Sequence, residues 1–174
     1  MGFGIGHSMG SIVGRIFAQR YPDAAQGMIL TGTTQYPTFL SISICTLLKI
    51  ITLVLGKHRR LDWLNKIMYK SFNKNINNQK TASDWLSSDA NEVEQFIKDP
   101  YTGFLVSNQL IYQVMKQMVS TSRMKNIKQM NANLPVLLIS GKDDPLGDNV
   151  PGRSLGSNLY QNVKRAQVLN DKHN

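Results

Sequence analysis

Hydrophobic positions near the N-terminus follow a strand pattern, then a helix pattern, then a strand pattern again. Residues 1–5 are short, apolar and glycine-rich, as at the end of a buried strand. Residues 11–21 predict a helix, with apolar side chains at helical spacing: Ile12, Val13, Ile16 and Phe17. Residues 26–33 form an apolar run that ends in Thr-Gly-Thr, which is typical of a buried strand in a parallel sheet. The opening therefore predicts a strand–helix–strand unit with a right-handed crossover.

The middle of the chain has a different pattern, with no convincing strand between residues 36 and 99. Helical spacing predicts helices within residues 39–55 and 61–68, and a third that starts at 88–92 and ends before Asp99-Pro100. Residues 73–80 form a polar loop rich in Asn and Lys. This section is interpreted as a helical insertion.

The last part of the chain returns to strands. A helix is expected at residues 109–118, and the clearest strand of the chain follows at 136–140. That strand ends in a loop signal at 141–145. A helix over 157–164 and a short strand over 166–169 are also expected. Together with the opening, this order predicts an α/β protein with a parallel sheet.

The residues between the first strand and the first helix are Gly6-His7-Ser8-Met9-Gly10. A G-x-S-x-G sequence between a strand and a helix predicts a nucleophile elbow, a sharp turn that presents the serine hydroxyl. In so tight a turn, side chains at positions 6 and 10 are expected to collide with the strand or the helix, which explains the glycines. The motif alone is weak, and its alternative is an ordinary glycine-rich turn.

A serine nucleophile needs a base, usually a histidine oriented by a carboxylate. The chain can meet the order serine, acid, histidine with Ser8, then Asp143 or Asp144, then His173. Loops at the carboxyl ends of parallel strands open on one side of a sheet, so these residues can meet there. The backbone N–H of Met9 would be one oxyanion donor. The alternatives are that the aspartates cap a loop and that His173 belongs to a frayed end.

The remaining candidates for chemistry are few. His7 is expected to pack, and His58 to lie on the surface within the basic cluster 57–60. The single cysteine, Cys45, excludes an intramolecular disulfide and is expected to be a buried thiol. Residues 39–55 contain polar side chains and are too short for a clean membrane span, so they predict an amphipathic or buried helix.

Composition narrows the class of protein. The chain has 174 residues, of which 41% are hydrophobic and 18% charged, which favours a globular domain with a core. The net charge of +9 would suit nucleic acid or an anionic membrane surface. The cations are scattered, however, and no stripe of basic residues with interleaved aromatics occurs. Nucleic-acid binding is therefore not expected.

Several stretches together resemble the α/β-hydrolase family, in particular its lysophospholipase and monoacylglycerol-lipase-like branch, also known as serine aminopeptidase-like hydrolases. The resemblance is carried, in the order of that family, by residues 6–11, 27–33, 71–74, 84–89, 99–100 with 103–104, 134–141 and 144–147. It implies a partial α/β-hydrolase fold, a parallel sheet with flanking helices, a helical lid insertion, and the N-terminal strands missing. The chain then corresponds to the C-terminal part of a hydrolase, with core at 1–35, lid at 36–105 and core at 106–174.

The resemblance also implies roles for individual residues. Ser8 matches the nucleophile, Asp144 (the aspartate directly before proline) matches the acid, and His173 matches the histidine. The implied activity is hydrolysis of monoacylglycerols or lysophospholipids through an acyl-enzyme. The alternatives are an inactive fragment of such a hydrolase, and a peptidase or small-ester hydrolase of the same fold. No metal or organic cofactor is implied, peripheral membrane contact is possible in this branch, and a cytoplasmic location is expected.

Overall fold

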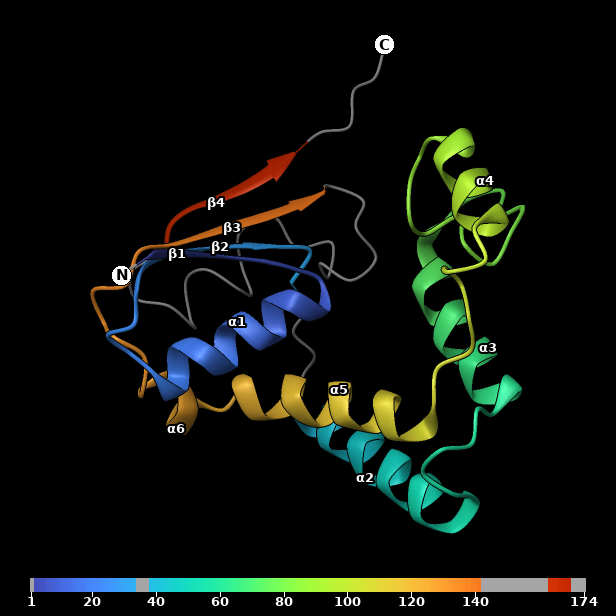
Figure 1. The fold of residues 1–174 in the computed structure, drawn as a ribbon, viewed down its shortest axis with the longest axis horizontal. Coiled ribbons are helices and arrows are strands. Elements are labelled where there is room, and N and C mark those ends of the chain that lie inside the picture. The colour runs from blue at the N-terminus through green and yellow to red at the C-terminus, as the bar shows by residue number, and fades with distance from the viewer. Residues whose placement is uncertain (1, 34–37, 142–162, 170–174) are drawn as a thin grey trace. The chain divides into compact units, whose positions relative to one another are not determined.

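A parallel β-sheet organises the part of the chain that carries the serine motif. The computed structural model describes residues 2–33, 38–141 and 163–169. Within them, four strands pair side by side in chain order, all parallel (Figure 1): β1 (Gly2–His7), β2 (Ala25–Thr31), β3 (Val136–Gly141) and β4 (Val163–Leu169). The parallel sheet predicted from the apolar runs is thus confirmed.

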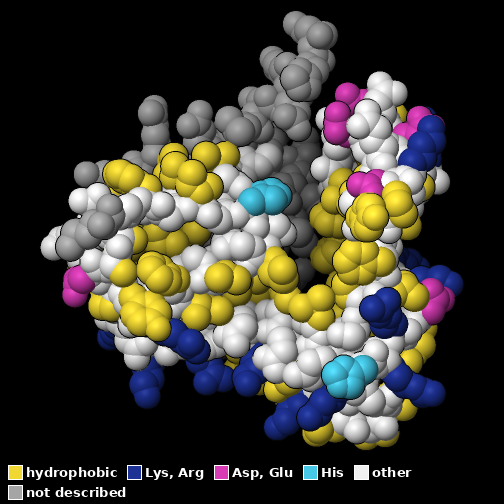
Figure 2. Space-filling model, viewed as in Figure 1, with side chains coloured by type: hydrophobic (Ala, Val, Ile, Leu, Met, Phe, Trp, Pro, Cys, Tyr) yellow, Lys and Arg dark blue, Asp and Glu magenta, His cyan; other side chains and the backbone are white. Residues whose placement is uncertain are grey.

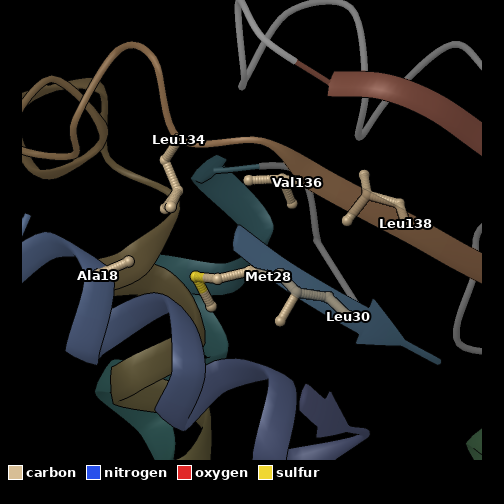
Figure 3. Close-up of a cluster of buried hydrophobic side chains, with 6 residues drawn as sticks. All are labelled: Ala18, Met28, Leu30, Leu134, Val136 and Leu138. Carbon is tan, nitrogen blue, oxygen red and sulfur yellow. The ribbon is translucent and has the colours of Figure 1, made fainter. Parts of the chain in front are cut away.

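Helix α1 (Met9–Arg20) connects β1 to β2 and lies against one face of the sheet (Figure 1). Its approach to the sheet is close. A Cβ built on Gly14 would lie 3.0 Å from the Met28 Cε atom and 3.4 Å from a Leu30 methyl carbon. The core beneath the helix is a cluster of buried apolar side chains from α1, β2, β3 and the segment before β3 (Figure 3): Ala18, Met28, Leu30, Leu134, Val136 and Leu138.

The buried face of α1 differs from the one that its apolar spacing predicts. Ile12 is buried, but Val13 and Phe17 are 59% and 43% exposed. The inner face instead includes Arg15 and Gln19, both buried. Arg15 Nη2 donates to Ser122 Oγ at 3.1 Å, and Gln19 Nε2 donates to the Thr121 carbonyl at 2.9 Å. These polar side chains are tolerated inside because distant parts of the chain provide hydrogen-bond partners for them.

Strand β1 was expected to be buried, and this prediction is wrong. Phe3 and Ile5 are 73% and 77% exposed, whereas Gly6 is buried. The physical reason is position: β1 is an edge strand of the described sheet, and successive side chains of a strand point to opposite faces. Gly4 and Gly6 face α1, and Phe3 and Ile5 point to the other face.

The remaining helices largely follow the predicted pattern. They are α2 (Thr38–Leu55), α3 (Asp62–Phe72), η1 (Asn73–Asn75), α4 (Ala90–Lys98), α5 (Asn108–Thr121) and α6 (Met124–Ile127). The predicted start of the third helix in the insertion is confirmed, because Asp89 caps α4 by accepting a hydrogen bond from Asn91 N at 2.8 Å. The 3₁₀ turn η1 occupies part of the predicted polar loop 73–80.

Two expectations near the C-terminus fare differently. The strand expected at 166–169 is confirmed, and it begins earlier, at Val163. The helix expected over 157–164 is wrong at its last two residues, because Val163 and Lys164 belong to β4. Residues 157–162 lie outside the described part of the chain.

Cys45 in α2, which was expected to be a buried thiol, is half-buried.

Residue contacts divide the chain into two compact units. One comprises residues 1–46 and 113–174, and the other is Leu47–Tyr112. In the second unit, the Phe72 and Trp85 rings pack with centroids 4.7 Å apart, and Asn73 Nδ2 donates to the Ala82 carbonyl at 2.8 Å. Among the described residues, no helix combines the length and apolar character that crossing a membrane requires.

Candidate active site

The backbone at Ser8 has an uncommon conformation. Ser8 lies between the end of β1 and the start of α1, with φ 50° and ψ −117°. A non-glycine residue at positive φ in this region is strained by about 1–3 kcal/mol and persists only where its surroundings hold it. Of the described residues other than glycine, only Ser8 and Asn78 have positive φ. The strain coincides with the serine that the motif singles out.

Hydrogen bonds from neighbouring elements hold this turn. Ser8 N donates to the Thr31 carbonyl at the end of β2, at 2.9 Å. On the other side, Ser11 N and Ser11 Oγ both donate to the Ser8 carbonyl, at 2.9 and 2.6 Å. Ser11 is completely buried. Its role was not foreseen, although its position three residues into a helix start is where a hydroxyl can reach back to the turn.

The two glycines of the motif differ in the space around them. A Cβ on Gly6 would lie 2.6 Å from the Gly10 carbonyl oxygen and 3.0 Å from Ser11 Cα, closer than any side chain could approach. Among the described residues, a Cβ on Gly10 would meet no atom within 4 Å. The steric requirement expected for both glycines is therefore present at Gly6 and absent at Gly10. Gly6 is crowded because the first turn of α1 passes directly over the end of β1, where Gly6 lies.

His7 makes a polar contact instead of packing. Its side chain is exposed, and Nδ1 lies 2.6 Å from Thr31 Oγ1 on the neighbouring strand. The expectation that His7 packs is therefore wrong. The sequence carries no signal for this pair, because only the register of β1 on β2 brings His7 opposite Thr31.

Met9 is the first residue of α1, directly after Ser8, and its side chain is 52% exposed. The first N–H groups of a helix lack intrahelical acceptors and carry partial positive charge. The Met9 amide belongs to this first turn and is adjacent to Ser8 in the chain. A helix N-terminus of this kind favours an anion bound beside it.

The predicted acid and histidine, Asp144 and His173, lie outside the described residues, as does Asp143. The strands that lead to them are described, and their register can be followed. His7 pairs with Thr31, Thr31 with Ile139, and Ile139 with Gln167, so one row of residues crosses all four strands. Ser8 follows this row directly. Asp144 and His173 follow it a few residues later, after β3 and β4.

Metal chemistry has no support among residues 2–33, 38–141 and 163–169. They contain no group of three or more His, Cys, Asp or Glu side chains that could hold a metal ion. His58, the other described histidine, is exposed on the surface as expected.

Comparison with known proteins gives a family match over nearly the whole chain. A model of the family described as serine aminopeptidase, S33, matches residues 2–172. No curated protein sequence gives a significant match.

Solved structures resemble the chain in fold. A carboxyl esterase from Bacillus coagulans is 23% identical, with a TM-score of 0.83 over 97% of this chain and 56% of its own. A monoglyceride lipase from Saccharomyces cerevisiae is 19% identical, with a TM-score of 0.59 over 84% of this chain and 45% of its own. A monoacylglycerol lipase from Paleococcus ferrophilus is 18% identical, with a TM-score of 0.54 over 97% and 57%. This chain thus spans about half the length of these structures, and the likeness shows the α/β-hydrolase fold.

Proposed function

Because the chain belongs to the serine aminopeptidase S33 family of α/β-hydrolases, we propose that it contributes the nucleophile of a serine carboxylester hydrolase. The observation that carries the proposal is the strained turn at Ser8, held by Thr31 and Ser11 at the end of a parallel strand. A turn of this kind exposes a hydroxyl beside a helix N-terminus, which is what nucleophilic attack on an ester requires.

The proposed mechanism is acyl transfer in two steps. Ser8 Oγ attacks the ester carbonyl carbon while His173 accepts the hydroxyl proton, and the Met9 N–H donates to the resulting oxyanion. His173 then returns the proton to the leaving alcohol, and an acyl-enzyme remains. Water hydrolyses the acyl-enzyme with His173 again as the base. Asp144 orients the imidazole and stabilises its charged form.

The order of the strands supports Asp144 and His173 in these roles. β3 and β4 are parallel to β1, and parallel strands end at the same edge of a sheet. Strands β3 and β4 therefore end at the edge of the sheet at which Ser8 lies, and Asp144 and His173 follow these strands in the sequence. Asp144 is preferred to Asp143 because it directly precedes Pro145, as in the family pattern.

The proposed substrates are lipid-like esters, namely monoacylglycerols or lysophospholipids. Two structural neighbours are monoglyceride or monoacylglycerol lipases and a third is a carboxyl esterase. The compact unit of residues 47–112 falls mostly within the range 36–105, which supports the proposal that this insertion is a lid. Helix α2, which lies within the range 36–105, is rich in apolar residues, as a lid that receives an acyl chain would be. A cytoplasmic location stays a prediction.

Covalent labelling tests the nucleophile directly. The 174-residue chain is treated with a fluorophosphonate, and its intact mass is measured. We expect one adduct on the native chain, one on Ser71→Ala, and none on Ser8→Ala. Ser71 is an exposed serine in α3, so its variant controls for nonspecific reaction. An adduct that persists in Ser8→Ala would remove Ser8 from the role of nucleophile.

Ester turnover tests the remaining residues and the substrate class. Asp144→Asn and His173→Ala should each lower kcat by a factor on the order of a thousand or more, because the serine loses its base or the orientation of that base. Long-chain monoacylglycerols should give a higher kcat/KM than short-chain esters. Equal turnover of both would contradict the lipid-like substrate.

Two alternatives are separated by the same assays. The family description favours a peptidase, which would cleave aminoacyl anilides faster than esters through the same acyl-enzyme. The second alternative is a chain that contains the elbow but does not hydrolyse esters. It is favoured because this chain spans only about half the length of each structural neighbour. In that case folded protein would react with neither the fluorophosphonate nor the esters.

A further inference from the structure

The peptide group that joins Ser8 to Met9 is held by two hydrogen bonds from Ser11. The Ser8 carbonyl oxygen accepts one bond from the Ser11 amide at 2.9 Å and one from the Ser11 hydroxyl at 2.6 Å. The amide bond belongs to the ordinary start of a helix, and any residue except proline can make it at this position. The hydroxyl bond needs a side chain that donates. The side chain of Ser11 therefore adds a bond that the helix alone does not supply.

Ser11 lies on the buried side of α1, and Met9 lies on the outer side. Met9, Val13 and Phe17 follow one another at helical spacing and are 52%, 59% and 43% exposed. Hydrophobic side chains are visible over this helix in Figure 2. Ser11 has no exposed area, and its Cα would lie 3.0 Å from a Cβ built on Gly6 of β1. Bulk water does not reach the Ser11 side chain, so its hydroxyl has no competing partner in solvent.

The bonds to the Ser8 carbonyl also fix the direction of the Met9 amide. The peptide bond between the two residues is trans and planar, so its C=O and N–H groups point in opposite directions. The carbonyl points toward Ser11, and the Met9 N–H therefore points away from it, out of the N-terminal end of α1. Ser8 is strained at φ 50°, and a rotation that relieved this strain would turn the same peptide plane. The Ser11 hydroxyl opposes that rotation.

We propose that Ser11 is a positioning residue for ester hydrolysis by this chain. Its hydroxyl holds the peptide plane from which the Met9 N–H donates to the oxyanion that forms when Ser8 attacks. The inference rests on the proposed function and adds a residue to the proposed set of Ser8, Asp144 and His173. Ser11 acts only through the peptide between Ser8 and Met9.

Kinetics of monoacylglycerol hydrolysis by the 174-residue chain test this role. The oxyanion is present in the transition state and absent from the bound ester, so its stabilisation affects kcat and not KM. Ser11→Ala should lower kcat about tenfold to a hundredfold with KM within about twofold, a smaller loss than complete removal of an oxyanion donor. A trifluoromethyl ketone, which forms a tetrahedral oxyanion on a serine, should bind more weakly by a similar factor. An unchanged kcat, or a change confined to KM, would overturn the proposal.

Thr121→Val is the matched control for the loss of a buried hydroxyl. Thr121 is 1% exposed in the same compact unit, and its hydroxyl donates to the Gln117 carbonyl at 2.9 Å and to the Met118 carbonyl at 3.2 Å. Urea unfolding should show that Thr121→Val loses at least as much stability as Ser11→Ala. Its kcat should nevertheless stay within about twofold of the native value. An equal fall of kcat in both variants would mean that lost stability, and no positioning, explains the effect of Ser11.

Ser11→Cys is a second variant that tests the hydroxyl even if Ser11→Ala does not fold. A thiol fills nearly the same space and donates a weaker hydrogen bond, so kcat should fall about threefold to tenfold with KM again within about twofold. A native kcat in Ser11→Cys would contradict the role of the hydroxyl.

The direction of the Met9 N–H can be measured without turnover, which separates this inference from the proposed function. In a weakly aligned sample, the residual dipolar coupling of an N–H bond reports its direction. Ser11→Ala should change the coupling of Met9 and leave that of Val13, in the next turn of α1, at its native value. An unchanged Met9 coupling would overturn the inference even in a chain that hydrolyses esters. A changed coupling in a chain that hydrolyses no ester would contradict the proposed function alone and still support the role of Ser11 in holding this peptide.

Discussion

At the scale of single residues, the elbow depends on one glycine more than on the other. The Gly10 carbonyl lies where a side chain at position 6 would go, while position 10 itself is open. Gly6→Ala should lower the free energy of unfolding by about 1–3 kcal/mol, because the overlap with the backbone of α1 forces the turn to shift. Gly10→Ala should leave it unchanged or raise it by up to about 1 kcal/mol, because alanine favours the first turn of a helix.

Urea unfolding of both variants measures this difference, and fluorophosphonate labelling shows whether Ser8 keeps its position. We expect labelling of Gly10→Ala and slow labelling of Gly6→Ala. Equal stability of the two variants would contradict the crowding over the end of β1.

Asp84 is the residue whose charge most clearly supports local structure. Its carboxylate accepts hydrogen bonds from the Thr81 hydroxyl, from Thr81 N at 3.0 Å and from Lys80 N at 2.5 Å. The hydrogen bonds from Thr81 contribute most to holding the pKa of Asp84 below its ordinary value. The next residue, Trp85, packs on Phe72, so this turn supports a ring contact. The Asp-Trp pair of the family pattern is explained here by structure and not by catalysis.

The direction of that pKa shift predicts a pH dependence. A folded-state pKa below the unfolded one gives stability that is full above about pH 4 and is lost as the pH falls through the folded-state value. Asp84→Asn should therefore cost about 1 kcal/mol at pH 7, and the difference from the native chain should shrink toward pH 3. Urea unfolding at pH 7, 5 and 3 measures this gap. Asp62→Asn, which removes an exposed i,i+4 pair, serves as the control with a smaller effect.

At the scale of elements, α1 is held to the rest of its unit by polar side chains as well as by its apolar contacts. Gln19 is buried and donates to the Thr121 carbonyl at the end of α5. Gln19→Ala should lower the free energy of unfolding by about 1–3 kcal/mol, because a buried carbonyl loses its donor. Arg20→Ala, at the exposed neighbouring position, should change it by less than about 0.5 kcal/mol. Thermal or urea unfolding of the two variants measures their free energies of unfolding. Equal losses in both variants would contradict the role given to Gln19.

The elements that the sequence predicts well are those whose signal is local. The apolar run at Met28 and Leu30 and the Asp89 cap of α4 need no distant partner to be recognised, and both are confirmed. The inner face of α1 is different, because Arg15 and Gln19 are buried beside distant hydrogen-bond partners, Ser122 and Thr121. Contacts between residues a hundred positions apart leave no periodic pattern.

The candidate site likewise combines features with a local sequence signal and features that depend on distant contacts. The turn at Ser8 could be predicted from glycine spacing between a strand and a helix, and its strained backbone agrees with that reading. The His7–Thr31 pair and the Ser11 hydroxyl could not, since strand register and the path of α1 create them. The exposure of Ile50, Leu53 and Val54 on α2 could not be predicted either, because helical spacing indicates an apolar stripe and not the direction in which it faces.

At the scale of the whole molecule, two separate segments of the chain form one compact unit, and the segment between them forms the other. Residues 1–46 and 113–174 share a unit that residues 47–112 interrupt. The serine turn and the strands that lead toward Asp144 and His173 all belong to the interrupted unit.

The interruption has a consequence for how the protein is made. The core joins Met28 and Leu30 of β2 to Leu134, Val136 and Leu138, which the ribosome adds about a hundred residues later. At 5–20 residues per second, the first two strands wait on the order of 5–20 seconds for the third. During that time their apolar side chains and open edges are available to other nascent chains or to chaperones. The unit of residues 47–112 meets no such delay, because every residue that it needs has been synthesised before β3 begins.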